Sequence, residues 1–146
     1  MKIGIVAGEA SGDLLGSLLI KALKEEYANL EFVGIAGPKM EAAGAQSWFP
    51  MEKLAVRGYF EVIRSLRELL AIRRSVRDRM LRERPALFIG IDAPDFNFGL
   101  EKSLKQRGVK TVHYVSPSIW AWRGERIHKI RESVDHMLTV FPFEPE

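Results

Sequence analysis

Apolar and polar positions in this 146-residue chain follow two alternating patterns from one end to the other. Short apolar runs bounded by glycine, proline or polar residues predict buried strands, and apolar residues three and four positions apart predict helices. We expect strands at 2–7, 30–36, 46–49, 86–91, 110–114 and 135–140, and helices at 14–27, 39–43, 59–82, 95–106 and 123–131. Strands that alternate with helices predict right-handed crossovers and a parallel sheet covered on both faces. The sequence therefore predicts one doubly wound α/β domain.

The composition of the chain excludes several kinds of functional site. The chain has no cysteine, which excludes disulfides, thiol nucleophiles and thiolate metal ligands. Its histidines, His113, His128 and His136, show no metal-ligand spacing, so we expect neither a metal nor another cofactor. No apolar run approaches the ~20 residues of a membrane-spanning helix, and the first one meets Gly8 too early to be a signal peptide. We expect a cytoplasmic protein.

The net charge of +3 conceals one basic segment. Residues 57–84 carry nine arginines and four acids, a net charge of +5. The same segment has a broad apolar face that includes Tyr59, Phe60, Ile63 and Leu66. A basic amphipathic helix fits the surface of an anionic membrane, and a core helix with a solvated arginine face is the alternative. We expect no nucleic acid partner, because the aromatic residues are not interleaved with the arginines.

The stretch GIDAPDFN, residues 90–97, places two carboxylates and an amide where a strand ends and a helix begins. In an open α/β sheet, ligands bind at this edge. We expect Asp92 to be a catalytic base, Asp95 to cap the following helix, and Asn97 to contact the ligand. His113, from the next strand, is a candidate partner of Asp92, and the alternative is a histidine simply hydrogen-bonded in the core.

Two further loops carry polar or aromatic side chains. The loop GEASGD at 8–13 matches neither common phosphate-binding motif, and its Glu9 would repel a phosphate. A hydroxyl-rich ligand such as a sugar suits Glu9, Ser11 and Gly12 better, although Ser11 or Asp13 capping the helix would also explain the loop.

The loop after the strand at 110–114 contains two tryptophans. We expect Ser116, Trp120, Trp122 and Arg123 to bind a sugar or a base, and the alternative is a hydrophobic plug over the end of the sheet.

Four motifs in this order, VAGEASGD (6–13), GIAGPKM (34–40), GIDAPDFN (90–97) and HYVSPSIWAWR (113–123), resemble the lipid-A-disaccharide synthase family. The resemblance covers the whole chain. It implies a GT-B glycosyltransferase of two Rossmann-like domains, of which residues 1–146 would be the N-terminal, acceptor-side domain. Members of the family are more than twice as long, and their C-terminal half supplies most of the UDP-sugar site.

The family joins UDP-2,3-diacylglucosamine to 2,3-diacylglucosamine 1-phosphate, forming the lipid A disaccharide and UDP without a metal. It acts at the inner face of the inner membrane of Gram-negative bacteria, so the resemblance implies these substrates, an anionic membrane surface and, at full length, a homodimer. Asp92 matches the family's proposed base, and Arg123 is the candidate ligand of the acceptor phosphate. A stand-alone sugar- or nucleotide-binding module and half of another UDP-sugar enzyme are the alternatives.

Overall fold

The computed structural model describes residues 1–54, 59–115 and 136–139, with the side chains of 59–65, 94–95, 115 and 136–139 excepted. The strands are β1 (Lys2–Ala7), β2 (Glu31–Ile35), β3 (Ala45–Ser47), β4 (Leu87–Ile91), β5 (Thr111–Val115) and β6 (His136–Thr139). The helices are α1 (Ala10–Glu26), α2 (Pro38–Ala42), the 3₁₀ helix η1 (Met51–Leu54), α3 (Tyr59–Glu83) and α4 (Pro94–Gln106).

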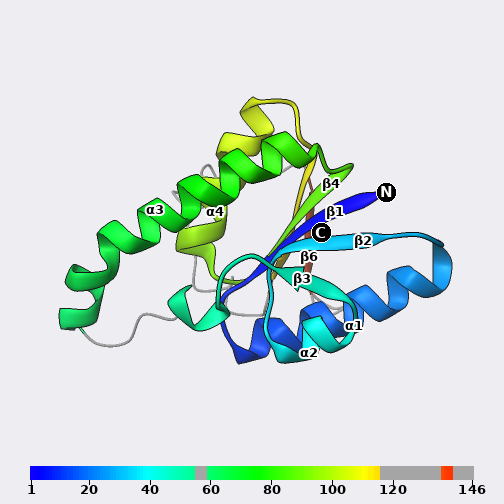
Figure 1. Ribbon diagram of the computed structural model, residues 1–146, viewed down its shortest axis with the longest axis horizontal. Coiled ribbons are helices and arrows are strands. Elements are labelled where there is room, and N and C mark those ends of the chain that lie inside the picture. Colours follow the sequence, from blue (N-terminus) through cyan, green and yellow to red (C-terminus); the bar gives the residue numbers. More distant parts are fainter. Residues whose placement is uncertain (55–58, 116–135, 140–146) are drawn as a thin grey trace.

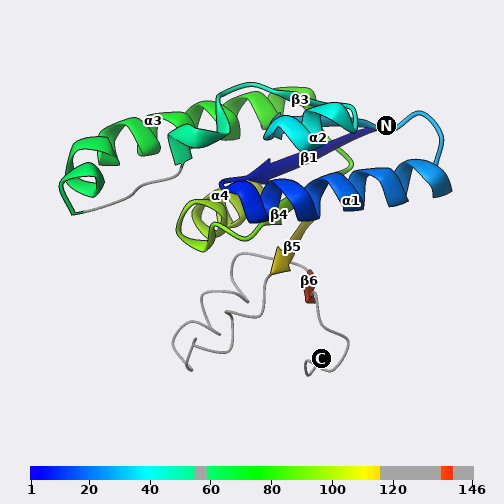
Figure 2. The same cartoon turned by 90° about the horizontal axis from the view of Figure 1, so that it is seen from below.

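The six strands form one sheet in the order β3-β2-β1-β4-β5-β6 (Figures 1 and 2), and every neighbouring pair is parallel. Helices α1 and α2 cover one face and α3 and α4 the other (Figure 1). Successive strand residues point to opposite faces, so Ile5 packs against Ile20 and Met40 while Val6 joins the cluster around Val76. The doubly wound α/β fold predicted from the sequence is confirmed.

The observed elements differ from the expected ones mainly at their ends. Helix α1 begins at Ala10, four positions before the apolar periodicity starts, because the polar residues after Gly8 form its first turn. The third strand begins one residue earlier and ends two residues earlier than expected, and it is followed by η1, which the pattern did not reveal. The helix expected at 123–131 lies outside the described residues.

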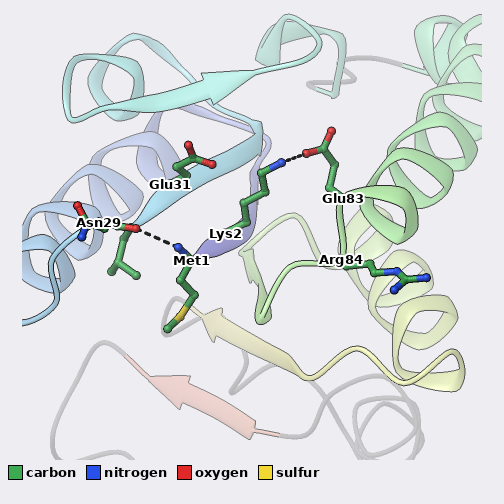
Figure 3. Close-up of a pocket in the computed structure, with 7 residues that line it drawn as sticks. Met1, Lys2, Asn29, Glu31, Glu83 and Arg84 are labelled. Carbon is green, nitrogen blue, oxygen red and sulfur yellow. Dashed lines mark hydrogen bonds and ion pairs between the residues drawn. The ribbon is translucent and has the colours of Figure 1, made fainter.

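Ionic and backbone contacts close the amino edge of the sheet. Lys2 pairs with Glu83, which joins β1 to the end of α3, and the amino group of Met1 donates to the Asn29 carbonyl at 3.0 Å. Figure 3 shows these groups around a cavity of about 620 Å³. The cavity lies opposite the edge at which parallel sheets bind ligands, and its contacts hold β1, β2 and α3 together.

A buried ionisable pair joins α4 to β5. The Nδ1 atom of His113 lies 2.8 and 2.9 Å from the two carboxyl oxygens of Glu101, and both side chains are fully buried. Gly90 in β4 makes room for the pair, because a Cβ there would come within 3.0 Å of the Glu101 carboxyl. The expected pairing of His113 with Asp92 is therefore wrong, and the core-histidine alternative is confirmed.

Burial makes this pair neutral. It raises the pKa of the Glu101 carboxyl well above its usual 4.5 and lowers the pKa of His113 from 6.5 to about 3. The unfolded chain binds a proton at His113 below pH 6.5, whereas the folded chain keeps this histidine neutral. The free energy of unfolding therefore decreases as the pH falls from 6.5 towards 3. The unfolded chain releases the Glu101 proton above pH 4.5, whereas the folded chain keeps it, so stability is also lost as the pH rises.

The substitution Glu101→Gln should remove the decrease in stability at rising pH, because glutamine does not titrate. We expect the urea midpoint of the wild type, measured relative to that of Glu101→Gln, to fall steadily as the pH rises above 4.5. Urea denaturation followed by circular dichroism at several pH values checks this. A midpoint difference that does not change with pH would contradict the neutral pair.

Candidate functional site

Three loops meet at the carboxyl edge of the sheet, after β1, β2 and β4 (Figure 1). The first and third lie in contact, since a Cβ on Gly8 would come within 3.0 Å of the Cβ of Ala93. The structure therefore brings together the stretches 8–13 and 92–97, which the sequence had marked separately. This is the edge at which open α/β sheets bind ligands.

Asp92 lies in a strained corner between β4 and α4. Asp92 and Ala93 have φ angles of 45° and 42°, both in the left-handed region. This conformation costs a residue other than glycine roughly 1–2 kcal/mol, and such strain is concentrated at functional sites. The Asp92 N–H donates to the Tyr114 carbonyl at 3.0 Å, and only 9 % of the residue is exposed. The corner thus holds a buried carboxylate in a fixed backbone position.

Asn97 anchors this corner from within the first turn of α4. Its side-chain NH₂ donates to the carbonyl of Asp92 at 3.0 Å and to those of Val6 and Ile91 at 3.3 Å each. The residue is fully buried. The amide therefore ties together the ends of β1 and β4, and its expected contact with a ligand stays a prediction.

The expectation that Asp95 caps α4 is wrong. The helix begins at Pro94, and the cap position is Ala93, with no side-chain hydrogen bond there. Proline suits the first helical position because its fixed φ is already helical, which moves Asp95 one residue inside the helix. An acid in the first turn still interacts favourably with the helix dipole.

Two of the three residues in the first loop that we expected to bind a ligand are exposed. Glu9 occupies the cap position of α1 and is exposed, as is Ser11 one residue into the helix. Gly12 is buried, because α1 lies so close to the sheet that a Cβ there would be 3.4 Å from the side chains of Ala7 and Ile91. Ligand binding by these three residues stays a prediction.

Asp13 caps a helix other than the one expected. No side chain caps α1, whereas the two Asp13 carboxyl oxygens accept hydrogen bonds from the backbone N–H groups of Lys39 and Met40 in α2, at 3.0 and 2.9 Å. The capping alternative for the first loop is therefore wrong. The available signal was the pair Gly37-Pro38, which starts a helix without a capping side chain of its own.

A hollow of about 360 Å³ opens beside α2, at the carboxyl ends of β2 and β3. One wall is formed by Gly37, Pro38 and Glu41, and the other by residues 47–52. The Ser47 hydroxyl shapes the second wall, since it accepts from the Ala36 N–H at 2.9 Å and donates to the Phe49 carbonyl at 2.7 Å. No motif or pattern in the sequence indicated this hollow.

Most of the residues expected to bind the sugar, the phosphate or the membrane lie, wholly or with their side chains, outside the described part of the structure. Ser116, Trp120, Trp122 and Arg123 lie outside the described residues. So do the side chains of Tyr59, Phe60 and Ile63, whose backbone lies in α3, whereas Leu66 is 52 % exposed and Leu70 is 41 % exposed.

The described residues contain neither a metal site nor a membrane-spanning helix. Their His, Asp and Glu side chains form no group of three that could hold a metal ion. No helix within the described ranges combines the length and apolar character needed to cross a bilayer.

A family model described as lipid-A-disaccharide synthetase matches residues 3–146. The lipid-A-disaccharide synthase of Methylobacillus flagellatus is 67 % identical over 144 residues, which are 99 % of this chain and 38 % of that protein. The synthases of Chromobacterium violaceum and Azotobacter vinelandii are 60 % and 57 % identical over 99 % and 100 % of the chain, which again matches 38 % of each relative. The chain thus spans about 38 % of the length of these relatives, and it belongs to the lipid-A-disaccharide synthetase family.

Proposed function

We propose that residues 1–146 form the acceptor-side domain of an inverting glycosyltransferase. The enzyme joins UDP-2,3-diacylglucosamine to 2,3-diacylglucosamine 1-phosphate and forms the lipid A disaccharide and UDP. The observation that carries this proposal is the buried carboxylate of Asp92 in a strained corner at the carboxyl edge of the sheet. The names of the similar proteins, lipid-A-disaccharide synthases, supply the substrate class.

Asp92 is the base in this mechanism. The acceptor's 6-hydroxyl attacks the anomeric carbon of the donor from the face opposite UDP, and its proton passes to the Asp92 carboxylate as the new C–O bond forms. The bond to UDP breaks in the same step. UDP leaves as a stabilised anion, which needs electrostatic stabilisation more than a proton. A base with a fixed backbone is suited to this role, because the reacting atoms must be held in line.

The acceptor lies along the edge formed by the first and third loops. Glu9 and Ser11 are exposed there and carry groups that hydrogen-bond sugar hydroxyls. Ser116, Trp120 and Trp122 would complete the sugar site, and Arg123 would hold the 1-phosphate through two parallel hydrogen bonds. For these four residues the support is the sequence motif alone.

Helix α3 docks the domain on the anionic inner face of the inner membrane. Its C-terminal half belongs to the core, since Ile72, Val76 and Met80 are buried against the sheet. In the preceding turns, by contrast, Leu66 and Leu70 are exposed one turn apart, beside the exposed Arg67. Exposed leucines beside arginines suit a helix at a lipid interface. Docking there would bring the acyl chains of both substrates to the domain, and a homodimer would present two such helices.

Residues 1–146 alone should transfer no sugar. They span 38 % of the relatives' length, and the resemblance places most of the donor site in the remainder. An assay with both substrates checks this, with the full-length Methylobacillus flagellatus enzyme as the positive control. Disaccharide formed at a rate near that of the control would contradict the division of the site between two domains.

Replacing Asp92→Asn should lower kcat by about 10²–10⁴-fold, because the amide keeps the shape of the side chain but cannot accept the proton. The measurement uses a chimera in which residues 1–146 replace the matching part of the Methylobacillus flagellatus enzyme. Asp95→Asn is the matched control, which should cost about 1 kcal/mol of stability at most, as expected for an acid in a first helical turn. An Asp92→Asn chimera that kept more than about a third of wild-type kcat would exclude Asp92 as the base.

The chain should bind vesicles that contain anionic lipid, less tightly as salt rises, and bind zwitterionic vesicles poorly. Each arginine near the surface contributes about 1 kcal/mol, and inserted apolar side chains add to this. Replacing Phe60, Ile63 and Leu66 together by serine should abolish binding in a co-sedimentation assay.

The control for the vesicle experiment is Leu14→Ser with Leu18→Ser, which removes two exposed leucines from α1 and should leave binding unchanged. Circular dichroism on the same samples reports the fold. If the triple variant unfolds, Leu66→Ser with Leu70→Ser provides the test, because both side chains are exposed. A folded α3 variant that bound anionic vesicles as tightly as wild type would exclude an apolar contribution from this helix.

A further inference from the structure

Asp92 is held through both of its backbone polar groups. Its carbonyl accepts from the Asn97 side chain at 3.0 Å, and its N–H donates to the Tyr114 carbonyl at 3.0 Å. A left-handed backbone with a φ of 45° persists only where the surrounding contacts fix it. Asn97 fixes the carbonyl side from α4. The N–H side depends instead on where β5 places the Tyr114 carbonyl.

The pair formed by Glu101 and His113 fixes this part of β5. His113 directly precedes Tyr114 in the strand, and its Nδ1 lies 2.8 and 2.9 Å from the two Glu101 carboxyl oxygens. Glu101 follows Asn97 by four residues in α4, so the two side chains leave the helix on the same face. Helix α4 therefore reaches the corner by two routes, directly through Asn97 and indirectly through the pair with the neighbouring strand.

The backbone and the side chains around the pair are matched to it. Gly90 of β4 is the register partner of His113, and a Cβ on Gly90 would come within 3.0 Å of the Glu101 carboxyl group. The ring of Phe98 packs against the His113 ring, with their centroids 4.5 Å apart. Glu101 and His113 have no exposed surface. Contacts from β4 and α4 therefore restrict the orientation of both groups.

The pair is an unfavourable way to fill the core. Burial keeps both groups neutral, so the protonated Glu101 carboxyl donates to Nδ1 of His113. The Nε2 atom then carries a proton, and it has no hydrogen-bond partner among the described residues. An unpaired buried donor destabilises a fold, and two apolar side chains would avoid that cost. What the pair adds is direction, because a hydrogen bond has a preferred geometry and apolar burial has none.

We propose that Glu101 and His113 are positioning residues for the transfer reaction, because they fix the strand whose carbonyl holds Asp92. The inference rests on the proposed function, in which Asp92 is the base. Both side chains are fully buried, so neither touches the reacting atoms. They act on the rate of proton transfer through the position of the Asp92 carboxylate, and they leave the binding of both substrates unchanged.

The first variant removes the hydrogen bond but keeps the core filled. In the chimera defined above, Glu101→Met with His113→Phe gives two apolar side chains, and the new ring can still pack against Phe98. Replacing both partners of a buried pair can leave stability nearly unchanged, which the urea midpoint checks. We expect kcat per mole of folded protein to fall about ten-fold, because a small displacement of a base has a large effect on rate. KM for the acceptor and KM for the UDP-sugar should stay unchanged.

Two further variants show whether the hydrogen bond is the cause. Glu101→Gln should keep kcat close to that of the wild type, because its NH₂ group donates to Nδ1 in place of the carboxyl O–H. Leu104→Met is the control, since it is a volume-conserving change at another buried position of α4. It should change neither kcat nor KM.

Gly90→Ala tests the pair from the side of β4. Its methyl group should displace the Glu101 carboxyl while both partners remain. We expect kcat to fall and both KM values to stay unchanged, as for the apolar pair. This variant provides the test if the apolar pair does not fold.

Asp92→Asn separates positioning from general support of the fold. If Glu101 and His113 act only through Asp92, the apolar pair or Gly90→Ala should cause no further loss of kcat once Asp92→Asn is present. A general disturbance of the fold would lower kcat in both backgrounds.

The possible results are distinguishable. An inactive wild-type chimera, or an Asp92→Asn chimera that keeps its kcat, would overturn the proposed function and the positioning role with it. If Asp92→Asn lowers kcat as expected, a folded apolar pair with wild-type kcat would overturn the positioning role alone. So would a rise in both KM values, a Glu101→Gln variant as slow as the apolar pair, or losses that multiply with that of Asp92→Asn.

Discussion

One buried amide group holds the candidate site together. The side chain of Asn97 donates to the carbonyls of Val6, Ile91 and Asp92, at the point where β1, β4 and α4 meet. Buried carbonyls at strand ends need a hydrogen-bond partner, and the left-handed corner at Asp92 and Ala93 is unfavourable on its own. The Asn97 amide supplies the hydrogen-bond donor for these carbonyls, and its bonds offset the cost of the left-handed corner. The position of the proposed base therefore depends on a residue that has no exposed surface.

Six residues of the stretch GIDAPDFN (90–97) have an identifiable role around this corner. Gly90 leaves room for the Glu101 carboxyl, which binds His113 on the neighbouring strand. Ile91 is fully buried in the core. Asp92 and Ala93 form the corner, and Pro94 starts α4 at a fixed φ. Asn97, within the first turn of that helix, reaches back to the corner. A carboxylate held at this strand end thus requires contacts on both sides of the strand.

Local patterns predicted the fold, because strand and helix periodicities extend over several residues and the order of elements limits the topology. They also marked the loops at the carboxyl edge, since polar residues after buried strands are visible in the sequence. The Asp13 contact with Lys39 and the Glu101 pair with His113 were missed, because each joins residues that no local pattern relates. The apolar face of α3 was visible in the sequence, but its division into buried and exposed turns is set by which turns pack against the core, and no local pattern shows that.

The proposed mechanism requires Asn97 to act on catalysis only by holding the corner that carries Asp92. The most direct test is a double-mutant cycle on kcat in the chimera, with Asn97→Ala and Asp92→Asn, per mole of folded protein. If Asn97 only positions Asp92, each single variant loses kcat and the double variant loses no more than Asp92→Asn alone. Losses of kcat that multiplied in the double variant would exclude a purely positioning role, because Asn97 would then contribute to transfer independently of Asp92.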